Sequence, residues 1–491
     1  MPHYLAFDLG AESGRAILGT LAADRLTIEE LHRFPNTPVR VFDALYWDIL
    51  RLWHEIQHGL GTAGKVAAGA RRLSLAGIGI DTWGVDFALL GADNALADNP
   101  RHYRDARTHG MMQKVFAVVP REEVFAQTGI QFMQLNSLYQ LYALKAAGSP
   151  ALAAARTLLF IPDLLNYWLT DVMRAELTIA STSQFYDPRR KTWATDLLGR
   201  LGLPVYILPE IVQPGTLLGP LLPSVAEPAG LDPVPVYATG CHDTASAVAA
   251  VPAGSGNWCY ISSGTWSLMG AELDEPVINA QSLEQNLTNE VGAAGKIRFL
   301  KNIAGLWLLQ ECRRAWAAEG AEYTYDDLVR MAASAAPFSA VIDPDSFLDP
   351  GDMPRKIAAW CRDTGQTPPA SPAEFTRTIL ESLALRYRQV LEGLESLAAR
   401  RFDVVHIVGG GSRNALLNQF VADATGRTVV AGPSEATAIG NILIQAMGAG
   451  ELAGLDAARA LVRRSFPVET YEPKATGDWE AAYARYCGLR R

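Results

Sequence analysis

The sequence predicts an α/β protein of two domains, because a glycine-rich hairpin opens each half of the chain. The hairpins run through residues 7–16 (FDLGAESGRA) and 261–268 (ISSGTWSL), and a third glycine loop, at 408–411 (VGGG), follows another apolar strand. Glycine permits positive φ and lets backbone N–H groups approach a ligand without a Cβ in the way. One such hairpin is usually only a turn between strands. Two facing hairpins with a third loop could hold a polyphosphate.

The length of 491 residues exceeds what one hydrophobic core usually serves, so about two to three domains are expected. Residues 252–256 (PAGSG) directly precede the second hairpin and form the candidate boundary. We therefore expect an N-terminal domain over residues 1–251 and a C-terminal domain over residues 252–491. The second half repeats the element order of the first, with a hairpin, then helices, then a strand.

Hydrophobic periodicity predicts the individual elements. In the first half, strands are expected at residues 5–9, 15–21, 25–34, 73–80 and 236–239, and helices at 46–60, 122–147, 163–169 and 244–251. In the second half, strands are expected at 258–262 and 404–408, and helices at 375–397, 414–424 and 436–446. The helices at 244–251 and 436–446 are rich in alanine and glycine. We expect them to cross closely at the domain interface and to act as a hinge.

Composition excludes several classes of partner. The net charge is −9, and no Lys/Arg run is longer than a pair, which argues against nucleic acid and against an anionic membrane surface. No uncharged apolar run is long enough to span a bilayer. ATP remains possible, because backbone N–H groups and Mg²⁺ can bind its phosphates locally.

Cysteine usage and the N-terminus indicate a cytoplasmic protein. The five cysteines are scattered and form no Cys-x-x-Cys pair. That pattern fits reduced thiols rather than a disulfide framework or a zinc site. The first residues carry no basic segment and lead straight into a strand, so no signal peptide is expected.

Two short motifs match known patterns out of context. Residues 54–58 (HEIQH) fit the H-E-x-x-H zinc pattern, but they lie opposite the apolar stripe of the expected helix, with no third ligand nearby, so a solvated helix face is expected. Residues 59–64 (GLGTAG) fit G-x-G-x-x-G but follow a helix rather than a strand, and are interpreted as a helix C-cap and loop. The sequence contains no P-loop pattern.

Asp243, which follows a strand and begins a helix, is the candidate catalytic residue. It could cap the helix, since Asp is favoured there and the helix dipole stabilises its charge. It could also act as a general base, because the same dipole keeps the carboxylate ionised and able to accept a hydroxyl proton. The two roles are compatible.

Residues 81–86 (DTWGVD), with 103–107 (YRDAR) downstream, carry the groups of a polyol pocket. The Asp81 carboxylate can accept from hydroxyls, the Trp83 ring can pack on C–H faces, and Gly84 admits a substrate close to the backbone. The alternative is a turn at a strand end, with Trp83 in the core and Arg104 or Arg107 in a salt bridge.

Residues 409–414 (GGGSRN) connect an expected strand to an expected helix. Helix N-termini bind anions, and a glycine turn leaves a flat slot for an aromatic base. The alternative is a tight structural connection without a ligand.

Together these motifs resemble those of the FGGY carbohydrate kinases. The resemblance runs from residue 6 to about residue 447 and rests on the first hairpin followed by six motifs: DTWGVDF, YRDAR, HDTASAV, SSGTWSLMG, LKNIAGLWLLQ and HIVGGG. It implies two actin/Hsp70-like (ribonuclease H-like) domains with ATP in the cleft between them. The residues that it implies for ATP are Ala11, Glu12, Ser13, Gly14, Arg15, Thr265, Gln310 and Gly410. Those that it implies for the sugar are Gly84, His242, Asp243, Thr244 and Asn302, with Asp243 as the base.

The resemblance further implies that Asp8 lies near Mg²⁺, directly or through water. Ala11 departs from the family, in which many members carry Thr or Ser, so Ser13 could replace the missing hydroxyl contact to phosphate. Residues 81–87 and 301–310 resemble the subgroup that phosphorylates L-rhamnulose at O1 in L-rhamnose catabolism. The alternatives are a kinase for another ketose (L-fuculose or a xylulose) and a non-kinase ATPase of the same superfamily. A monomer or a homodimer is expected.

Overall fold

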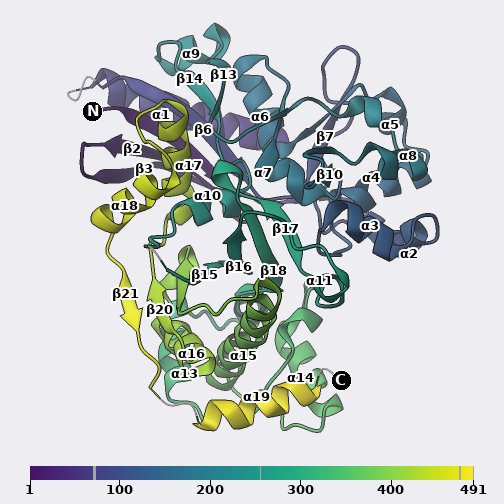
Figure 1. The fold of residues 1–491 in the computed structure, drawn as a ribbon, viewed down its shortest axis with the longest axis vertical. Coiled ribbons are helices and arrows are strands. Elements are labelled where there is room, and N and C mark those ends of the chain that lie inside the picture. The colour runs from purple at the N-terminus through teal and green to yellow at the C-terminus, as the bar shows by residue number, and fades with distance from the viewer. Residues whose placement is uncertain (70–72, 255, 475–476, 490–491) are drawn as a thin grey trace. The chain divides into compact units, whose positions relative to one another are not determined.

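The computed structural model describes residues 1–491 except 70–72, 255, 475–476 and 490–491, and Ser255 of the predicted linker therefore lies outside it. The chain forms two compact units (Figure 1). The first comprises Met1–Ala250, Glu272–Phe299 and Ala436–Ser465, and the second Val251–Ala271, Leu300–Glu435 and Phe466–Arg491. The α/β class with two domains is confirmed. The chain leaves the first unit beside the predicted boundary, and two later segments return to it.

A six-stranded sheet forms the centre of the first unit, in the order β13-β14-β6-β1-β2-β3. The strand β1 (His3–Leu9) is antiparallel to β2 (Ser13–Leu21) and parallel to β6 (Leu75–Thr82). Most of β1 is buried, as expected for a strand covered on both faces. The remaining strands of the sheet are β3 (Leu26–Pro35), β13 (Thr216–Pro220) and β14 (Pro235–Ala238).

The helix α1 (Ile49–Ala68) covers the face of this sheet that bears Phe7, and it corrects one prediction. The helix was expected to end near residue 60, yet it continues through the GLGTAG segment. A Cβ at Gly59 would lie 2.7 Å from the Phe7 ring, and one at Gly64 would lie 1.9 Å from the Ala229 carbonyl oxygen. The glycines therefore permit close packing against β1 and α9 (Pro223–Ala229). This packing outweighs their low helix propensity.

The helix α17 (Ala436–Gly448) covers the opposite face of the sheet and crosses α10 (Asp243–Ala249). A Cβ at Gly440 would lie 1.7 Å from the Ser246 carbonyl oxygen, so only glycine fits at the crossing. The close approach of the two small-residue helices is thereby confirmed. Both helices belong to the first unit, although residues 436–446 were assigned to the second domain from the sequence.

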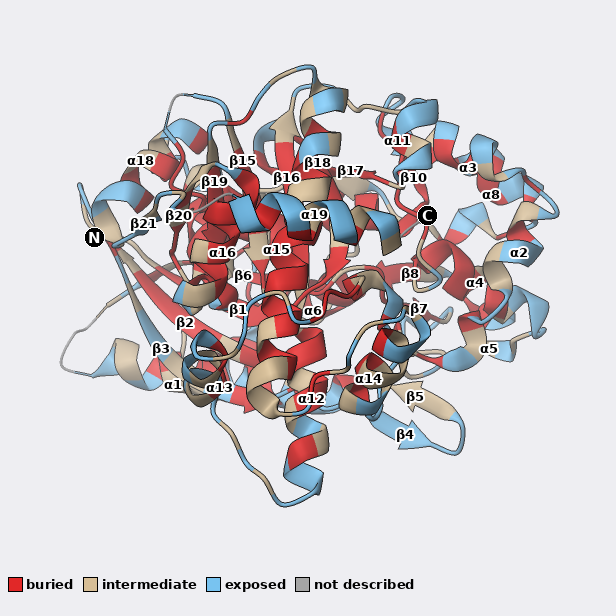
Figure 2. Cartoon of the chain, turned by 90° about the horizontal axis from the view of Figure 1, so that it is seen from below, coloured by how far each residue is buried: buried red, intermediate tan, exposed pale blue. Residues whose placement is uncertain are grey.

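The other elements of the first unit surround this sheet. The segment 122–147, expected to be largely helical, forms α3 (Arg121–Thr128) and α4 (Ser137–Ala146), separated after Gly129, whose φ is 63°. The hairpin of β4 (Val39–Val41), which is exposed, and β5 (Ala44–Tyr46), which is half-buried, precedes α1 (Figure 2). The remaining strands are β7 (Phe87–Leu90), β8 (Thr157–Phe160), β9 (Ala175–Glu176), β10 (Tyr186–Asp187), β11 (Thr192–Trp193), β12 (Ile211–Val212) and β17 (Thr288–Val291). The remaining helices are α2 (Met111–Phe116), α5 (Pro150–Ala154), α6 (Ile161–Thr170), α7 (Leu177–Ala180), α8 (Thr195–Arg200), α11 (Ala280–Glu284) and α18 (Leu455–Ser465).

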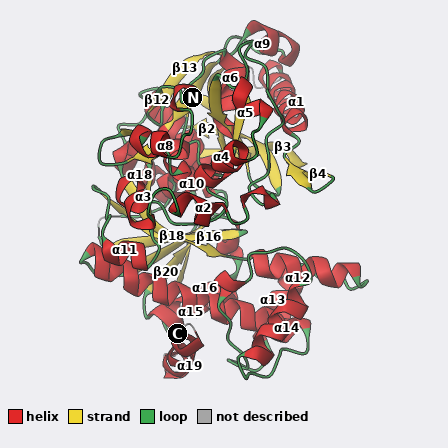
Figure 3. Ribbon diagram, turned by 90° about the vertical axis from the view of Figure 1, so that its right-hand side faces the viewer, coloured by secondary structure: helices red, strands yellow, loops and turns green. Residues whose placement is uncertain are grey.

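The second half contains the other predicted hairpin, β15 (Trp258–Ser263) and β16 (Trp266–Leu273), in a seven-stranded sheet of order β17-β18-β16-β15-β19-β20-β21. The parallel neighbour of β15 is β19 (Val404–Val408). The long helix α15 (Pro372–Ala398) is buried along much of its length (Figure 2). The other elements are β18 (Ile297–Ala304), β20 (Thr428–Ala431), β21 (Glu469–Tyr471), α12 (Trp307–Ala318), α13 (Tyr325–Ala333), α14 (Met353–Asp363), α16 (Ala415–Thr425) and α19 (Gly477–Leu489) (Figure 3).

All five cysteines are free thiols, as the sequence predicted. Across the described part of the chain, no helix combines the length and the apolar character needed to cross a membrane.

Candidate active site

The turn of the first hairpin is held by hydrogen bonds on both sides. The Gly10 N–H donates to the Ser13 carbonyl, and Asn36, which directly follows β3, forms two hydrogen bonds to the turn. The Asn36 N–H donates to the Glu12 carbonyl, and its Nδ2 donates to the Gly10 carbonyl, each at 2.9 Å. A Cβ at Gly14 would lie 2.3 Å from the Phe34 ring, so this glycine serves packing. The predicted phosphate-binding turn, which includes Ala11, is therefore preformed.

Two carboxylates lie side by side at the ends of parallel strands, because Asp8 on β1 is in register with Asp81 on β6. Asp8 also forms an ion pair with Arg15 at 2.5 Å. Asp81 Oδ2 accepts from Asn441 Nδ2, while its Oδ1 has no hydrogen-bond partner among the described residues. Burial, and then the charge of Asp8, raise the pKa of Asp81 well above its ordinary value. The pair is thus an acidic centre with unused acceptor capacity.

The turn after β6 orients its aromatic side chain into the core. Trp83 is buried against Trp47, with ring centroids 3.9 Å apart, and its Nε1 donates to Asp86 at 3.0 Å. Arg107 pairs with Asp105 at 3.2 Å. These contacts favour the structural alternative for Trp83. Asp81 is likewise fully buried and exposes no surface for a sugar.

The same turn carries backbone strain next to His242. Val85 has a φ of 70°, which β-branched residues rarely adopt. Its N–H donates to Thr182 Oγ1 at 3.2 Å, and its carbonyl accepts from Ser137 Oγ at 2.5 Å. Such strain persists only where surrounding contacts hold it, and it clusters at functional sites. The neighbouring Gly84 packs against His242, because a Cβ at Gly84 would lie 3.2 Å from His242 Nε2.

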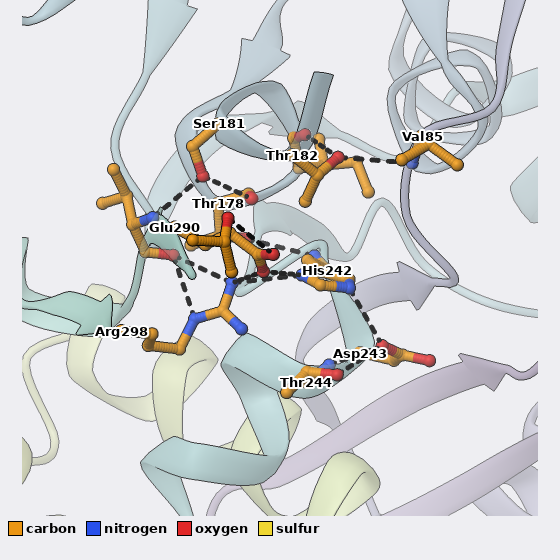
Figure 4. Close-up of polar contacts among 12 residues, drawn as sticks. Val85, Thr178, Ser181, Thr182, His242, Asp243, Thr244, Glu290 and Arg298 are labelled. Carbon is orange, nitrogen blue, oxygen red and sulfur yellow. Dashed lines mark hydrogen bonds and ion pairs between the residues drawn. The ribbon is translucent and has the colours of Figure 1, made fainter. Parts of the chain in front are cut away.

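Asp243 uses only one of its carboxylate oxygens in the described structure (Figure 4). The Oδ1 atom accepts from the Thr244 N–H at 2.6 Å and from Thr244 Oγ1 at 3.1 Å, and it lies 3.4 Å from His242 Nε2. The helix α10 begins at Asp243, so the N-cap residue is His242, which makes no side-chain cap. Asp243 is therefore the first residue of α10 rather than its N-cap, although its carboxylate accepts from the first-turn N–H of Thr244. The Oδ2 atom remains available to a proton donor.

His242 is held from two further directions. Its backbone N–H donates to Thr178 Oγ1 at 3.1 Å. Its Nδ1 lies 3.1 Å from Arg298 Nη2 and 3.4 Å from Glu290 Oε2, and those two side chains pair with each other at 3.2 Å (Figure 4). The first unit thus brings together His242, Asp243, Thr244 and Gly84.

In the second unit, the hairpin turn between β15 and β16 is joined to α12. The Trp307 N–H donates to the Thr265 carbonyl at 3.1 Å, and Gln310 Nε2 donates to Thr265 Oγ1 at 3.2 Å. The Gln310 Oε1 atom is buried and has no hydrogen-bond partner in the part of the chain that is described. The predicted pair Thr265 and Gln310 is therefore assembled in one place. Asn302, which was predicted to contact the sugar, lies on β18, the strand next to β16.

In the glycine loop after β19, two glycines are required by the backbone and its packing, and the third is not. Gly409 has a φ of 83°, and a Cβ at Gly411 would lie 2.0 Å from Ser263 Oγ, so both positions are structural. A Cβ at Gly410 would meet no atom within 4 Å among the described residues. The loop continues as a short 3₁₀ helix, Gly410–Arg413, before α16 begins with Asn414 as its N-cap. Gly410 thus faces open space, which agrees with a ligand slot.

The HEIQH segment differs in part from its prediction. His54 and His58 are exposed, as expected, but Glu55 is buried, and its Oε2 lies 2.7 Å from His32 Nε2 on β3. The ligand atoms of His32, Glu55 and His58 lie within 4.8 Å of one another. The second Glu55 oxygen accepts from Arg51 Nε at 2.8 Å. The carboxylate is therefore already hydrogen-bonded on both oxygens by protein groups.

Comparison with models of known protein families shows which family the chain belongs to. The N-terminal domain of the FGGY family of carbohydrate kinases matches residues 3–250, and its C-terminal domain matches residues 259–449. The chain belongs to the FGGY family of carbohydrate kinases. It is a sugar kinase, and kinases of this family use ATP as a substrate.

Relatives extend over the whole chain. It is 48% identical to the rhamnulokinase of Bacteroides thetaiotaomicron, covering 99% of this chain and 98% of the relative. It is 41% identical to the rhamnulokinase of Oceanobacillus iheyensis, covering 95% and 97%. Among solved structures, the ligand-bound xylulose kinase of Lactobacillus acidophilus superposes with a TM-score of 0.82 at 15% identity, covering 100% of this chain and 98% of the other. That likeness concerns the fold alone.

Sequence reasoning missed four polar residues that position the predicted ones, namely Asn36, Glu290, Arg298 and Asn441. Each joins segments that are far apart in the chain, so no local pattern connects it to the site. Asn441 alone left a signal, because it and Gln445 are polar residues one helical turn apart in an otherwise apolar, small-residue helix. Gln445 Nε2 donates to Asn441 Oδ1 at 2.7 Å.

Proposed function

We propose that this kinase transfers the γ-phosphoryl group of ATP to O1 of L-rhamnulose. The observation that carries the proposal is the similarity to rhamnulokinases, which extends over nearly the full length of the chain. The geometry around Asp243 is consistent with such a site. In the reaction, O1 of the sugar forms a bond to the γ-phosphorus, the bond from that phosphorus to the β–γ bridging oxygen breaks, and ADP leaves. The proton of the sugar hydroxyl must go to a base.

Asp243 is that base in our proposal. Its Oδ1 accepts hydrogen bonds from the Thr244 N–H and Oγ1, and these two contacts fix the orientation of the carboxylate. The Oδ2 atom then accepts the hydroxyl proton as O1 attacks. A phosphoryl transfer site needs little more chemistry than this base, positioned phosphates and a metal.

The sugar and the nucleotide are assigned to different residues. Gly84, His242, Thr244 and Asn302 contact the sugar, and the absence of a Cβ at Gly84 lets His242 Nε2 lie close to the backbone there. The turn from Ala11 to Arg15 contacts the phosphates, together with Thr265 and Gln310, whose buried Oε1 still lacks a partner among the described residues. Gly410 leaves the open slot in which the nucleoside lies.

The donor set around Asp8 fits Mg²⁺, which prefers carboxylate oxygens and retains several waters. Asp8 supplies the carboxylate, and the fully buried Asp81 lies in register with it on the neighbouring strand. When bound, Mg²⁺ would offset the negative charge of the phosphates. Asp8 would hold it directly or through water, with Arg15 sharing the Asp8 carboxylate.

A substrate panel tests the proposal. ADP release is measured by a coupled assay with L-rhamnulose, L-fuculose, D-xylulose and glycerol, and L-rhamnulose should show the highest kcat/KM. Another ketose with a higher kcat/KM would overturn the substrate and leave the sugar kinase standing. ATP hydrolysis that no sugar stimulates would favour the ATPase alternative.

A further inference from the structure

The side chain of Arg298 is fully buried, yet it does not belong to the sugar or nucleotide set. It projects from β18, and its Nε and Nη2 donate to the Val291 carbonyl of the neighbouring β17 at 3.2 and 3.1 Å. The same Nη2 approaches His242 Nδ1 at 3.1 Å (Figure 4). Arg298 therefore fixes one edge of the imidazole of a proposed sugar ligand.

The chemistry of the guanidinium decides which imidazole nitrogen carries the proton. A guanidinium has only donors and stays protonated in proteins, so Nδ1 must be the acceptor of this hydrogen bond. A neutral imidazole that accepts at Nδ1 carries its hydrogen on Nε2. We propose that Arg298, paired with Glu290, is a positioning residue that locks His242 as the Nε2–H tautomer, so that it presents a fixed donor to the sugar.

Glu290 offers a competing arrangement, because its Oε2 lies 3.4 Å from His242 Nδ1 and could accept a proton from it. Two distances argue against this. The Arg298–Nδ1 contact is shorter, and Glu290 Oε2 lies closer to Arg298, at 3.2 Å, than to the imidazole. A proton on Nδ1 would also point at an N–H of Arg298. Glu290 therefore balances the charge of Arg298.

The Nε2 edge faces the proposed sugar site. It lies 3.4 Å from Asp243 Oδ1, the oxygen already engaged by Thr244, and it packs closely beside Gly84, where a Cβ would lie only 3.2 Å from Nε2. At that length the contact with Asp243 is weak. The Nε2–H is thus available to a sugar oxygen placed next to the base. A rotated or Nδ1–H imidazole would present an acceptor there and leave the sugar oxygen without its donor.

Stability alone does not explain the buried pair of Glu290 and Arg298, because apolar residues of similar volume often stabilise a fold equally well. Glu290 and Arg298 side chains are only 5% and 0% exposed. Removing one partner alone would leave an uncompensated buried charge. The test therefore replaces both together, as Arg298→Met/Glu290→Leu.

The first test is the tautomer itself, measured on the full chain with ¹⁵N-labelled histidine. The eight histidines are observed near pH 8 by imidazole ¹H–¹⁵N correlation, and the signal lost in His242→Gln identifies residue 242. An unprotonated Nδ1 with a protonated Nε2 is expected. A protonated Nδ1, or a signal averaged between the two tautomers, would overturn the proposal. This outcome does not depend on what the enzyme phosphorylates.

The kinetic consequence rests on the proposed function. In Arg298→Met/Glu290→Leu, the KM for the sugar should rise about tenfold, the effect of one lost hydrogen bond, while the KM for ATP stays unchanged. Combined with His242→Ala, the variant should add nothing to the sugar KM of His242→Ala alone, because Arg298 acts through His242. Additive effects would overturn the proposal.

A matched control removes an ion pair of the same type in the other unit. Arg427 and Glu395 pair at 3.0 Å, and neither belongs to the proposed site. Arg427→Met/Glu395→Leu should leave the sugar KM unchanged at a comparable thermal midpoint. If the parent enzyme shows no activity on any ketose, the proposed function fails, but the tautomer measurement still decides the role of Arg298.

Discussion

The two hairpins share a topology and differ in what they offer a ligand. In each, two antiparallel strands are followed by a later strand that runs parallel to the first, β6 beside β1 and β19 beside β15. The first hairpin carries charged residues near its turn. Asp8 pairs with Arg15 and is in register with Asp81 on the adjacent strand β6. The second ends in hydroxyl and glycine residues around Ser263, Thr265 and Gly410.

This difference separates two tasks that phosphoryl transfer requires. Carboxylates can accept a proton or hold a metal, so the chemistry is expected in the first unit. Glycine and hydroxyl groups can surround a nucleotide without adding charge, so the second unit is expected to bind it.

The largest expected effect comes from removing the proposed base. Asp243→Asn keeps the shape of the side chain and its contacts with Thr244 but removes its basicity. We expect kcat to fall by about 10²–10⁴, the usual contribution of a positioned base, with both KM values little changed. Steady-state kinetics at saturating ATP and sugar provide the measurement.

A control for this variant is Asp48→Asn, which changes the carboxylate that caps α1 and should leave kcat unchanged. If well-folded Asp243→Asn retains a kcat within a few-fold of the parent, Asp243 is not the base. The assignment of chemistry to the first unit would then have to be abandoned.

The next effect concerns the crossing of α10 and α17. Gly440→Ala places a Cβ 1.7 Å from the Ser246 carbonyl oxygen. Overpacking of this kind costs about 1–3 kcal/mol or more, and the urea midpoint should fall accordingly. Gly61→Ala is the control, since its Cβ would meet no described atom within 4 Å, and alanine stabilises an exposed helix by up to about 1 kcal/mol. Equal midpoints for the two variants would refute the tight crossing.

Gly410→Val tests the open slot of the second unit. The branched side chain meets no described atom within 4 Å at its Cβ, so the thermal midpoint should be retained. It would occupy the space assigned to the nucleoside and raise the KM for ATP about tenfold, equivalent to about 1.4 kcal/mol, with little change for the sugar. An unchanged KM for ATP in a stable variant would make the loop purely structural.

The remaining prediction is that Asp81 of the first unit makes the stability of the protein depend on pH. Because burial and Asp8 raise the folded-state pKa of Asp81, the folded protein binds more protons than the unfolded chain. The stability from this group is full below the unfolded pKa of about 4 and is lost as pH rises through the raised folded value. The free energy of unfolding should therefore decline with rising pH by about 1.4 kcal/mol for each unit by which the folded pKa exceeds the unfolded pKa. In Asp81→Asn this decline should be smaller.

Urea unfolding of Asp81→Asn at a series of pH values from 4 upwards measures this difference. Asp274→Asn, at an exposed carboxyl paired with Lys296, serves as the control and should follow the parent. An identical pH dependence in Asp81→Asn and the parent would mean that Asp81 titrates normally. The first hairpin would then lack its acidic centre.

Local patterns in the chain were enough to predict the elements and their class. The apolar runs at 5–9 and 404–408 and the periodic helix at 375–397 all form where they were expected, because burial of one side or stripe leaves a local period in the chain. The glycine and hydroxyl hairpins were equally readable, since a turn requires particular residues at adjacent positions. Family membership followed from the same local motifs.

The contacts that join distant segments emerged only with the packed fold. Packing continued α1 through Gly59 and Gly64, because close contact with β1 and α9 outweighed helix propensity. It also placed Trp83 in the core, and it brought Asn441 to Asp81 and Arg298 to His242 across gaps of 360 and 56 residues. Such contacts have no local signature, because their partners meet only after the strands and helices that carry them have packed.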